Sequence, residues 1–377
     1  MKRSLILMCS LVFILVFSTA CSSKSNSSNE GSAKSNEDEQ ITLRVSSGLA
    51  EVHSWFEVYF NSWMEQIEED TGGKVKFEVF TGGSLVPIKG EMDALKTGTI
   101  DIALPLWPIY EPSRFPLTEV TMLPLTKTDS VIAAKSFQQL LNSDQELKDG
   151  LTYREYDFSN HELKVFPVPP IQSYVLSSVK NKFDSIDSFN GALIRTSGPA
   201  LELLVKNLGA SPTTISASDL FEAVSRGSVD GNLQAIADWR SYGFDEILKN
   251  TIEGVNLGHF SAVLAMTDEK WESLPQDVQD VIENVSQNLQ IPGGEKWDEI
   301  GDEVKKVNIE HGGDFTNINE LDSETQTFII SALEKTWFDW IENLESKGHP
   351  GKEIAILWRD LILENGGDVP QKIKDLE

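Results

Sequence analysis

An arginine, Arg195, follows a short apolar run in the sequence FNGALIRTSG at positions 189–198. The run from Ala192 to Ile194 is typical of a buried strand, so the guanidinium is expected at the carboxyl end of that strand. A guanidinium offers paired planar donors that match a carboxylate, and it keeps its charge at any physiological pH. Two roles are open: a clamp for the carboxylate of a ligand, or a buried ion pair with one of the chain's many acids.

Three further side chains follow predicted strands and are candidates for a pocket. Trp107 and Tyr110 come after a strand predicted at 99–104, and His53 comes after a strand predicted at 41–46. Aromatic rings at such positions line pockets about as often as they pack in cores, so both roles are open for them. For His53 the alternatives are a hydrogen bond to a ligand and the more frequent surface loop position.

Motifs of the common catalytic and cofactor sites are missing from the sequence. The histidines are scattered without metal-ligand spacing, and the patterns GxSxG, GxxxxGK[ST] and GxGxxG do not occur. The carboxylates are too numerous for one acid–base pair to stand out. We therefore expect no enzyme, no cofactor and no metal site.

The composition is strongly acidic. The chain has 377 residues, and its 59 Asp and Glu against 32 Lys and Arg give a formal net charge of −27. Such a surface repels nucleic acid and anionic lipid headgroups, so neither is expected as a ligand. The length predicts two domains rather than one compact core.

The N-terminus has the pattern of a targeting segment. Residues 1–20 combine two basic residues, an apolar run and small residues before Cys21, which is typical of a signal peptide. The polar stretch 21–40 reads as a flexible tether, and positions 18–21 resemble a lipoprotein processing site with Cys21 as the lipidated residue. Plain secretion is the alternative, whereas the apolar run is short for a single-pass anchor.

The rest of the chain alternates between strand and helix patterns. This alternation predicts α/β domains with mostly parallel sheets. The predicted strands are 41–46, 75–80, 99–104, 173–179 and 192–197, and the predicted helices include 54–69, 199–208 and 216–226. The last third is predicted as long amphipathic helices that pack across both domains, with breaks at 291–294 and 311–314.

Two segments far apart in the sequence share one pattern. DALKTGTIDIAL at 93–104 and EAVSRGSVDGNL at 222–233 both have an acid, an alanine, a glycine and an aspartate at matching positions. Each reads as a helix end, a glycine C-cap and a strand. The repeat predicts one equivalent unit in each of two lobes.

The region 189–235 resembles a known protein family. Its FNGALIR, GASP and LFEAVSRGSVDG segments are similar to the DctP-type solute-binding proteins of tripartite ATP-independent periplasmic (TRAP) transporters. The resemblance extends through DALKTGTIDIAL and MTDEKWESLPQDVQDVI. It implies an α/β, two-lobed periplasmic-binding-protein-like (type II) fold, with a ligand cleft between the lobes and long C-terminal helices.

The resemblance also implies roles for individual residues. Arg195 matches the family's carboxylate-binding arginine, and Gln234 stands where many members have a ligand-contacting asparagine. The second arginine of sialic-acid-binding members would fall near Val175 and is absent, so sialic acid is not expected. Tyr174 beside it is a neutral donor instead, which favours a monocarboxylate or aromatic acid at least as much as a C4-dicarboxylate.

Together these features predict a lipid-anchored solute receptor on the extracellular face of the membrane. It would bind an organic acid by hinge closure and deliver it to TRAP permease subunits. The predicted domains are lobe I at 41–168 plus 256–296 and lobe II at 169–255 plus 297–377. The alternatives are the binding protein of an ATP-driven importer, a two-lobed sensor ectodomain, and an enzyme or structural envelope protein.

Overall fold

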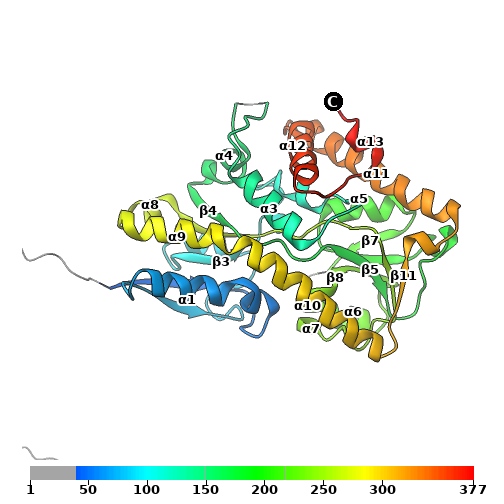
Figure 1. The fold of residues 1–377 in the computed structure, drawn as a ribbon, viewed down its shortest axis with the longest axis horizontal. Coiled ribbons are helices and arrows are strands. Elements are labelled where there is room, and N and C mark those ends of the chain that lie inside the picture. Colours follow the sequence, from blue (N-terminus) through cyan, green and yellow to red (C-terminus); the bar gives the residue numbers. More distant parts are fainter. Residues whose placement is uncertain (1–39, 149, 216) are drawn as a thin grey trace, which may run out of the picture. The chain divides into compact units, whose positions relative to one another are not determined.

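The computed structural model describes residues 40–148, 150–215 and 217–377. The predicted signal peptide at 1–20, the lipidation site Cys21 and nearly all of the predicted tether lie outside the described residues. Residues 40–377 form one compact unit that contains two β-sheets with helices packed around them (Figure 1).

The first sheet has the strand order β2-β1-β3-β10-β4. Strand β1 pairs in parallel with β2 and β3, whereas β10 is antiparallel to both β3 and β4. The strands are β1 (Ile41–Ser46), β2 (Val75–Phe80), β3 (Ile102–Leu106), β4 (Leu163–Pro167) and β10 (Val263–Thr267). Strand β3 begins later than predicted because Gly98 and Thr99 still form hydrogen bonds to the end of the preceding helix.

The second sheet has the order β11-β9-β5-β8-β6-β7. Strand β6 is parallel to β7 and β8, whereas β5 is antiparallel to β8 and β9. Its strands are β5 (Tyr174–Ser178), β6 (Leu193–Thr196), β7 (Ser211–Thr214), β8 (Gly231–Ala235), β9 (Asn250–Glu253) and β11 (Asp314–Asn317). The prediction of mostly parallel sheets is confirmed for the described residues: in each sheet a single strand, β10 in the first and β5 in the second, runs opposite to all the others.

The chain passes between the sheets three times: two passages are extended segments, and the third, between β10 and β11, is helical. The chain leaves the first sheet after β4 at 168–173 and returns to it before β10 at 254–262. The segments run side by side, since the Ile171 amide donates to the Phe260 carbonyl at 3.1 Å and the Tyr174 amide to the Gly258 carbonyl at 2.9 Å.

Helices cover both sheets (Figure 1). The apolar spacing in the predicted first helix is confirmed, since Trp55, Tyr59, Trp63 and Ile67 are all buried. The α-helices are α1 (Asn61–Asp70), preceded by a π-turn η1 (Phe56–Phe60), α2 (Glu91–Lys96), α3 (Ser130–Leu141), α4 (Tyr153–Asp157), α5 (Pro199–Asn207), α6 (Ala217–Ser225), α7 (Trp239–Tyr242), α8 (Asp268–Glu272), α9 (Gln276–Asn288), α10 (Gln290–Glu310), α11 (Ser323–Ser346), α12 (Gly351–Glu364) and α13 (Gln371–Lys374).

Helix α10 corrects one predicted break. It runs through 291–294, where the glycines serve close packing rather than termination. A side chain on Gly293 would overlap Pro169, and one on Gly294 would come within 2.8 Å of the Ser130 carbonyl oxygen. The break predicted at 311–314 is confirmed, because α10 ends there and Gly312 has a φ of 85°.

The internal sequence repeat corresponds to a structural repeat. After α2, the Gly98 amide donates to Leu95 and the next amide to Ala94; after α6, the Gly227 amide donates to Val224 and the next amide to Ala223. The aspartates of the repeat also act alike. Asp101 accepts from the Arg44 amide at 2.8 Å, and Asp230 accepts from the Leu193 amide at 2.8 Å. Each carboxylate thus ties the start of one strand to its neighbour.

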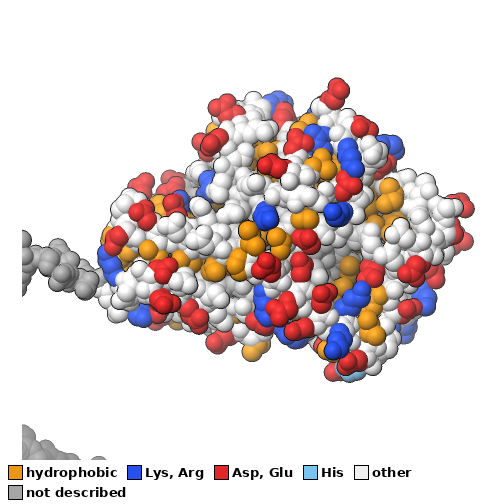
Figure 2. Space-filling model, in the orientation of Figure 1, with side chains coloured by type: hydrophobic (Ala, Val, Ile, Leu, Met, Phe, Trp, Pro, Cys, Tyr) orange, Lys and Arg blue, Asp and Glu red, His pale blue; other side chains and the backbone are white. Residues whose placement is uncertain are grey.

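The surface agrees with the acidic composition. Figure 2 shows acidic side chains over the whole visible face, with basic ones between them. Within the described part of the chain, no helix combines the length and the apolar character needed to cross a membrane.

Several carboxylates lie in the interior, which predicts a pH dependence of stability. Burial raises the pKa of Glu119 to about 8 and those of Glu91 and Asp157 to about 7. A raised folded-state pKa stabilises the fold at low pH, and this contribution is lost as the pH rises through the folded-state value. We expect the free energy of unfolding to fall by roughly 3 to 4 kcal/mol between pH 6.5 and 8.5. Chemical denaturation at both pH values measures this change, and an unchanged or higher stability at pH 8.5 would contradict it.

Candidate functional site

One cavity between the two sheets brings together all of the ligand-binding residues predicted from sequence. In this conformation the cavity is nearly filled by its own side chains, and the volume open to the centre of a water-sized sphere is about 30 Å³. The predicted residues that line it are His53, Trp107, Tyr110, Tyr174, Arg195 and Gln234. Its lining also includes residues that the sequence did not single out: Leu49, Trp55, Ile88, Ile171, Asp238, Tyr242 and Phe260.

Arg195 is held in this cavity by neutral groups. Its side chain is on β6 and the residue is only 2% exposed. Nε donates to the Ile215 carbonyl at 3.0 Å, and Nη1 donates to the Leu233 carbonyl at 3.1 Å. Within the described residues no carboxylate lies within 4.0 Å of the guanidinium, so the ion pair considered as an alternative is not formed there. The carbonyls orient the charge without neutralising it.

Aromatic rings form much of the cavity wall. Tyr110 and Phe260 have ring centroids 5.3 Å apart, and Tyr174 stacks on Phe260 with an interplanar angle of 9°. Trp107 lies 6.0 Å from Tyr110, and its Nε1 is buried without a hydrogen-bond partner in the described structure. The carboxyl end of β3 supplies Trp107 and Tyr110, and β5 supplies Tyr174. The wall is thus apolar but retains an indole donor.

His53 is buried rather than placed on a surface loop. It is 7% exposed, and burial lowers its pKa to about 4, so the ring is neutral at neutral pH. Nδ1 accepts from the Trp55 amide at 3.4 Å, which leaves the proton on Nε2. Nε2 is 3.0 Å from the Tyr242 hydroxyl, to which it therefore donates.

Asp238 is the main functional candidate that the sequence reasoning missed. It is 7% exposed, and burial raises its pKa to about 7, against the opposing effects of the Arg195 charge and a hydrogen bond from Gln234. Gln234 thus contacts Asp238, and its Oε1 accepts from Asn232 Nδ2 at 3.2 Å. The available signal was an acid just beyond an apolar strand, but a chain with 59 acids offers many such positions.

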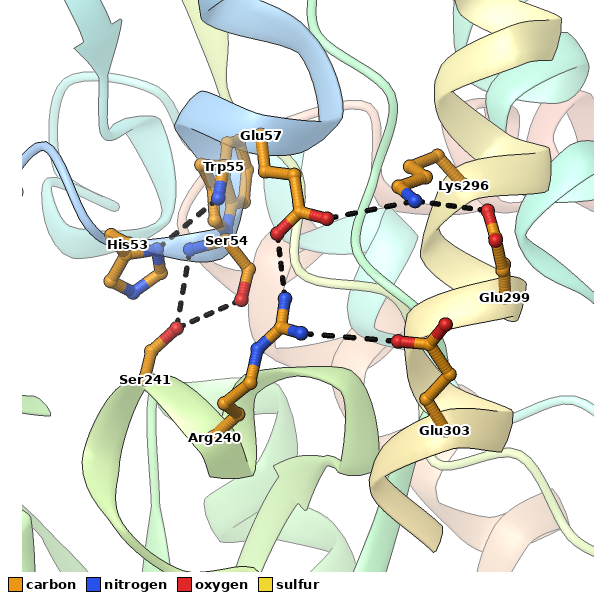
Figure 3. A network of polar contacts seen from close by, with 9 residues as sticks. All are labelled: His53, Ser54, Trp55, Glu57, Arg240, Ser241, Lys296, Glu299 and Glu303. Atoms are coloured by element: carbon orange, nitrogen blue, oxygen red, sulfur yellow. Dashed lines mark hydrogen bonds and ion pairs between the residues drawn. The ribbon is translucent and has the colours of Figure 1, made fainter. Parts of the chain in front are cut away.

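A second group of contacts joins the two sheets beside the cavity (Figure 3). We call it the edge network, and it consists of Ser54, Glu57, Arg240, Ser241, Lys296, Glu299 and Glu303. The Ser54 and Ser241 hydroxyls are 2.9 Å apart, and Arg240 Nη2 lies 2.7 Å from Glu57 Oε2. Lys296 on α10 is 3.5 Å from Glu57, and Glu303 is 3.9 Å from Arg240. The segment after β1, helix α7 and helix α10 are therefore fastened together.

Comparison with known proteins identifies the family at this point. Residues 45–339 match the family model of the bacterial extracellular solute-binding proteins, family 7 (DctP). The chain belongs to this family. Its members are solute-binding proteins and not enzymes, which removes the enzyme alternative.

Relatives of known description are distant in sequence. The outer membrane transporter protein TsaT of Comamonas testosteroni is 23% identical over 329 residues, covering 84% of this chain and 90% of that protein. The C4-dicarboxylate-binding periplasmic protein DctP of Rhodobacter capsulatus is 25% identical over 226 residues, covering 58% of this chain and 63% of that protein.

Solved structures of TRAP solute-binding proteins share the fold. A marine metagenome protein specific for aromatic acids, in complex with metahydroxyphenylacetate, superimposes with a TM-score of 0.76 at 20% identity, covering 87% of this chain and all (100%) of that one. A Bordetella bronchiseptica protein with bound (R)- and (S)-mandelate gives 0.72 at 19% identity, covering 86% and 99%. The expected two-lobed α/β fold with long C-terminal helices is confirmed.

Proposed function

We propose that this family member captures an organic acid in the cavity between its sheets and that Arg195 binds the ligand's carboxylate. The observation that carries the proposal is a buried guanidinium oriented by two carbonyls, with no carboxylate partner in the described structure. A buried cation without a counter-ion is costly, and an anionic ligand removes that cost. In an acidic protein, this one local charge makes the cavity selective for anions.

The ligand that the cavity favours is a monocarboxylate with an aromatic or otherwise apolar body. Arg195 is the single Lys or Arg among the described residues that line the cavity, so a second carboxylate would find no second cation there. The rings of Trp107, Tyr110, Tyr174 and Phe260 suit a flat apolar body. Bound aromatic acids in two fold relatives, metahydroxyphenylacetate and mandelate, are consistent with this choice.

Delivery to a TRAP permease and attachment to the membrane complete the proposal. The lobe boundaries predicted from sequence, at 41–168 plus 256–296 and 169–255 plus 297–377, would define the two bodies that close on the ligand. Cys21 would carry the lipid and 21–40 would be the tether that keeps the receptor at the extracellular face. Incorporation of labelled palmitate that is lost in Cys21→Ser tests the anchor. Neighbouring genes for two membrane subunits without an ATPase would favour a TRAP permease over an ATP-driven importer.

The binding proposal is tested by thermal unfolding of the purified chain, lacking the predicted signal segment, with a panel of acids. A ligand that binds only the folded state raises the melting temperature by mass action. We expect aromatic and small monocarboxylates to raise it, and neutral amides of the same acids to leave it unchanged. Equal shifts with acids and amides, or no shift with any acid, would contradict the proposal.

A further inference from the structure

Asp238 presents a buried, incompletely bonded carboxylate to the same cavity as Arg195. Its Oδ1 has no hydrogen-bond partner in the described structure, although the residue is 7% exposed. The Nε2 atom of the neutral His53 ring is 4.0 Å from that oxygen, and the guanidinium of Arg195 is not within pairing distance. A buried acceptor left without a donor is unfavourable, and each such group in a folded protein calls for an explanation.

We propose that Asp238 selects ligands that carry a hydrogen-bond donor, a hydroxyl or an ammonium group, in addition to the carboxylate held by Arg195. The inference rests on the proposed function and narrows it to donor-bearing carboxylic acids. Arg195 and Asp238 recognise different ends of the ligand, and the aromatic wall fills the space between them.

The surroundings of Asp238 fit a role toward a ligand better than a purely structural one. Gln234 contacts the carboxylate and is itself held by a hydrogen bond from Asn232. These contacts fix the position of the carboxylate but leave Oδ1 without a hydrogen-bond partner in the described structure. His53 Nε2 and Asp238 Oδ1 are 4.0 Å apart, so one ligand atom can lie about 2.8 Å from both. A hydroxyl there would donate to the carboxylate and would share the single imidazole N–H with the Tyr242 hydroxyl.

Ligands with a hydroxyl donor and ligands with an ammonium donor are distinguished by how their binding affinity depends on pH. The charged and titratable groups that face Asp238 from neighbouring elements are Arg195, His53, Tyr110, Tyr174 and Tyr242. His53 is neutral above about pH 4 and burial raises the pKa of each tyrosine, so only Asp238 changes charge near pH 7. A ligand carboxylate offsets the Arg195 charge that lowers the pKa of Asp238, so a hydroxy acid binds with proton uptake.

For a hydroxy acid, affinity is therefore expected to fall as the pH rises from 6.5 to 8.5. For an amino acid, the ligand's ammonium group takes the place of the proton on the Asp238 carboxylate. Its affinity is expected to hold or to increase over the same range, because the ionised form of Asp238 then makes the stronger contact.

The test is calorimetric binding of matched acids that differ at one carbon: 3-phenylpropanoate, 3-phenyllactate and phenylalanine, together with benzoate and 3-hydroxybenzoate. The wild-type chain should bind at least one donor-bearing acid about 10-fold to 100-fold more tightly than its unsubstituted partner. In Asp238→Leu, which removes the acceptor, this preference should fall below about threefold while the unsubstituted acid still binds. In Asp238→Asn the pH dependence should disappear.

Glu119→Gln is the matched control, because Glu119 is also a buried carboxylate with a raised pKa but does not line the cavity. It should keep the wild-type preference and the wild-type pH dependence. A wild-type chain that binds acids with no donor preference, or a preference that survives in Asp238→Leu, overturns the inference and leaves the proposed function standing. Failure of every acid to bind the wild-type chain overturns both.

Discussion

Arg195→Ala is expected to weaken binding of an organic acid by roughly 30-fold to several thousand-fold, because the loss of a desolvated charged partner costs about 2 to 5 kcal/mol. The guanidinium is 2% exposed and its charge is not offset by a carboxylate within 4.0 Å in the described structure. No other Lys or Arg lines the described cavity to replace it. Calorimetric titration with the acid that shifts the melting temperature most gives the measurement.

Arg154 provides a control with the same kind of anchoring outside the cavity. Its Nε donates to the Leu141 carbonyl at 2.8 Å and its Nη1 to the Val165 carbonyl at 2.9 Å. Arg154→Ala should lower stability through the same loss of carbonyl contacts but leave the ligand affinity within about twofold of wild type. If both alanine variants bind equally well, the carboxylate clamp is wrong.

Gly258→Ala is expected to lower the free energy of unfolding by about 3 to 5 kcal/mol, from a strained backbone and a steric overlap together. Gly258 has a φ of 92°, and an added Cβ would come within 2.6 Å of the Met122 Cα. The residue lies in the crossing between the sheets, where its carbonyl accepts from the Tyr174 amide at 2.9 Å. A shift of this backbone therefore also moves a ring of the cavity wall.

Gly366→Ala separates the two causes. Gly366 has nearly the same φ, 91°, but nothing lies within 4 Å of an added Cβ. This control should show only the conformational cost, about 1 kcal/mol. Urea unfolding of both variants measures the difference. Equal destabilisation would mean that the crossing segment relaxes and that the close approach to Met122 imposes no constraint.

Features that depend on neighbouring residues in the sequence could be predicted from it. The glycine caps at Gly98 and Gly227 and the position of Arg195 near the carboxyl end of a strand follow from local spacing and were found correctly. The direction of β10 and the role of Gly293 depend on contacts with distant segments, β3, β4 and Pro169, which no local pattern encodes.

The residues of the candidate site also divide into those that local sequence patterns predict and those that depend on distant segments. Trp107 and Tyr110 were found because they follow a predicted strand, and Arg195 because it lies near the end of another, since carboxyl ends of strands gather at one edge of a sheet. Asp238 was missed because it lies beyond its strand, in a short helical turn, and resembles dozens of solvated acids in composition. That Oδ1 of Asp238 has no partner in the described structure is a property of the folded cavity and not of the sequence around it.

The edge network would affect how tightly a ligand is held but not which ligand is preferred. Its ion pairs and hydroxyl contacts join the segment after β1 to α7 and α10 while lying outside the cavity lining. If the lobes close on the ligand as proposed, each contact that favours the joined arrangement adds equally to the hold on every ligand, and substitutions here would change residence time without changing preference. Because exposed ion pairs weaken as electrolyte is added, the salinity of the surroundings would set how readily the receptor releases its cargo.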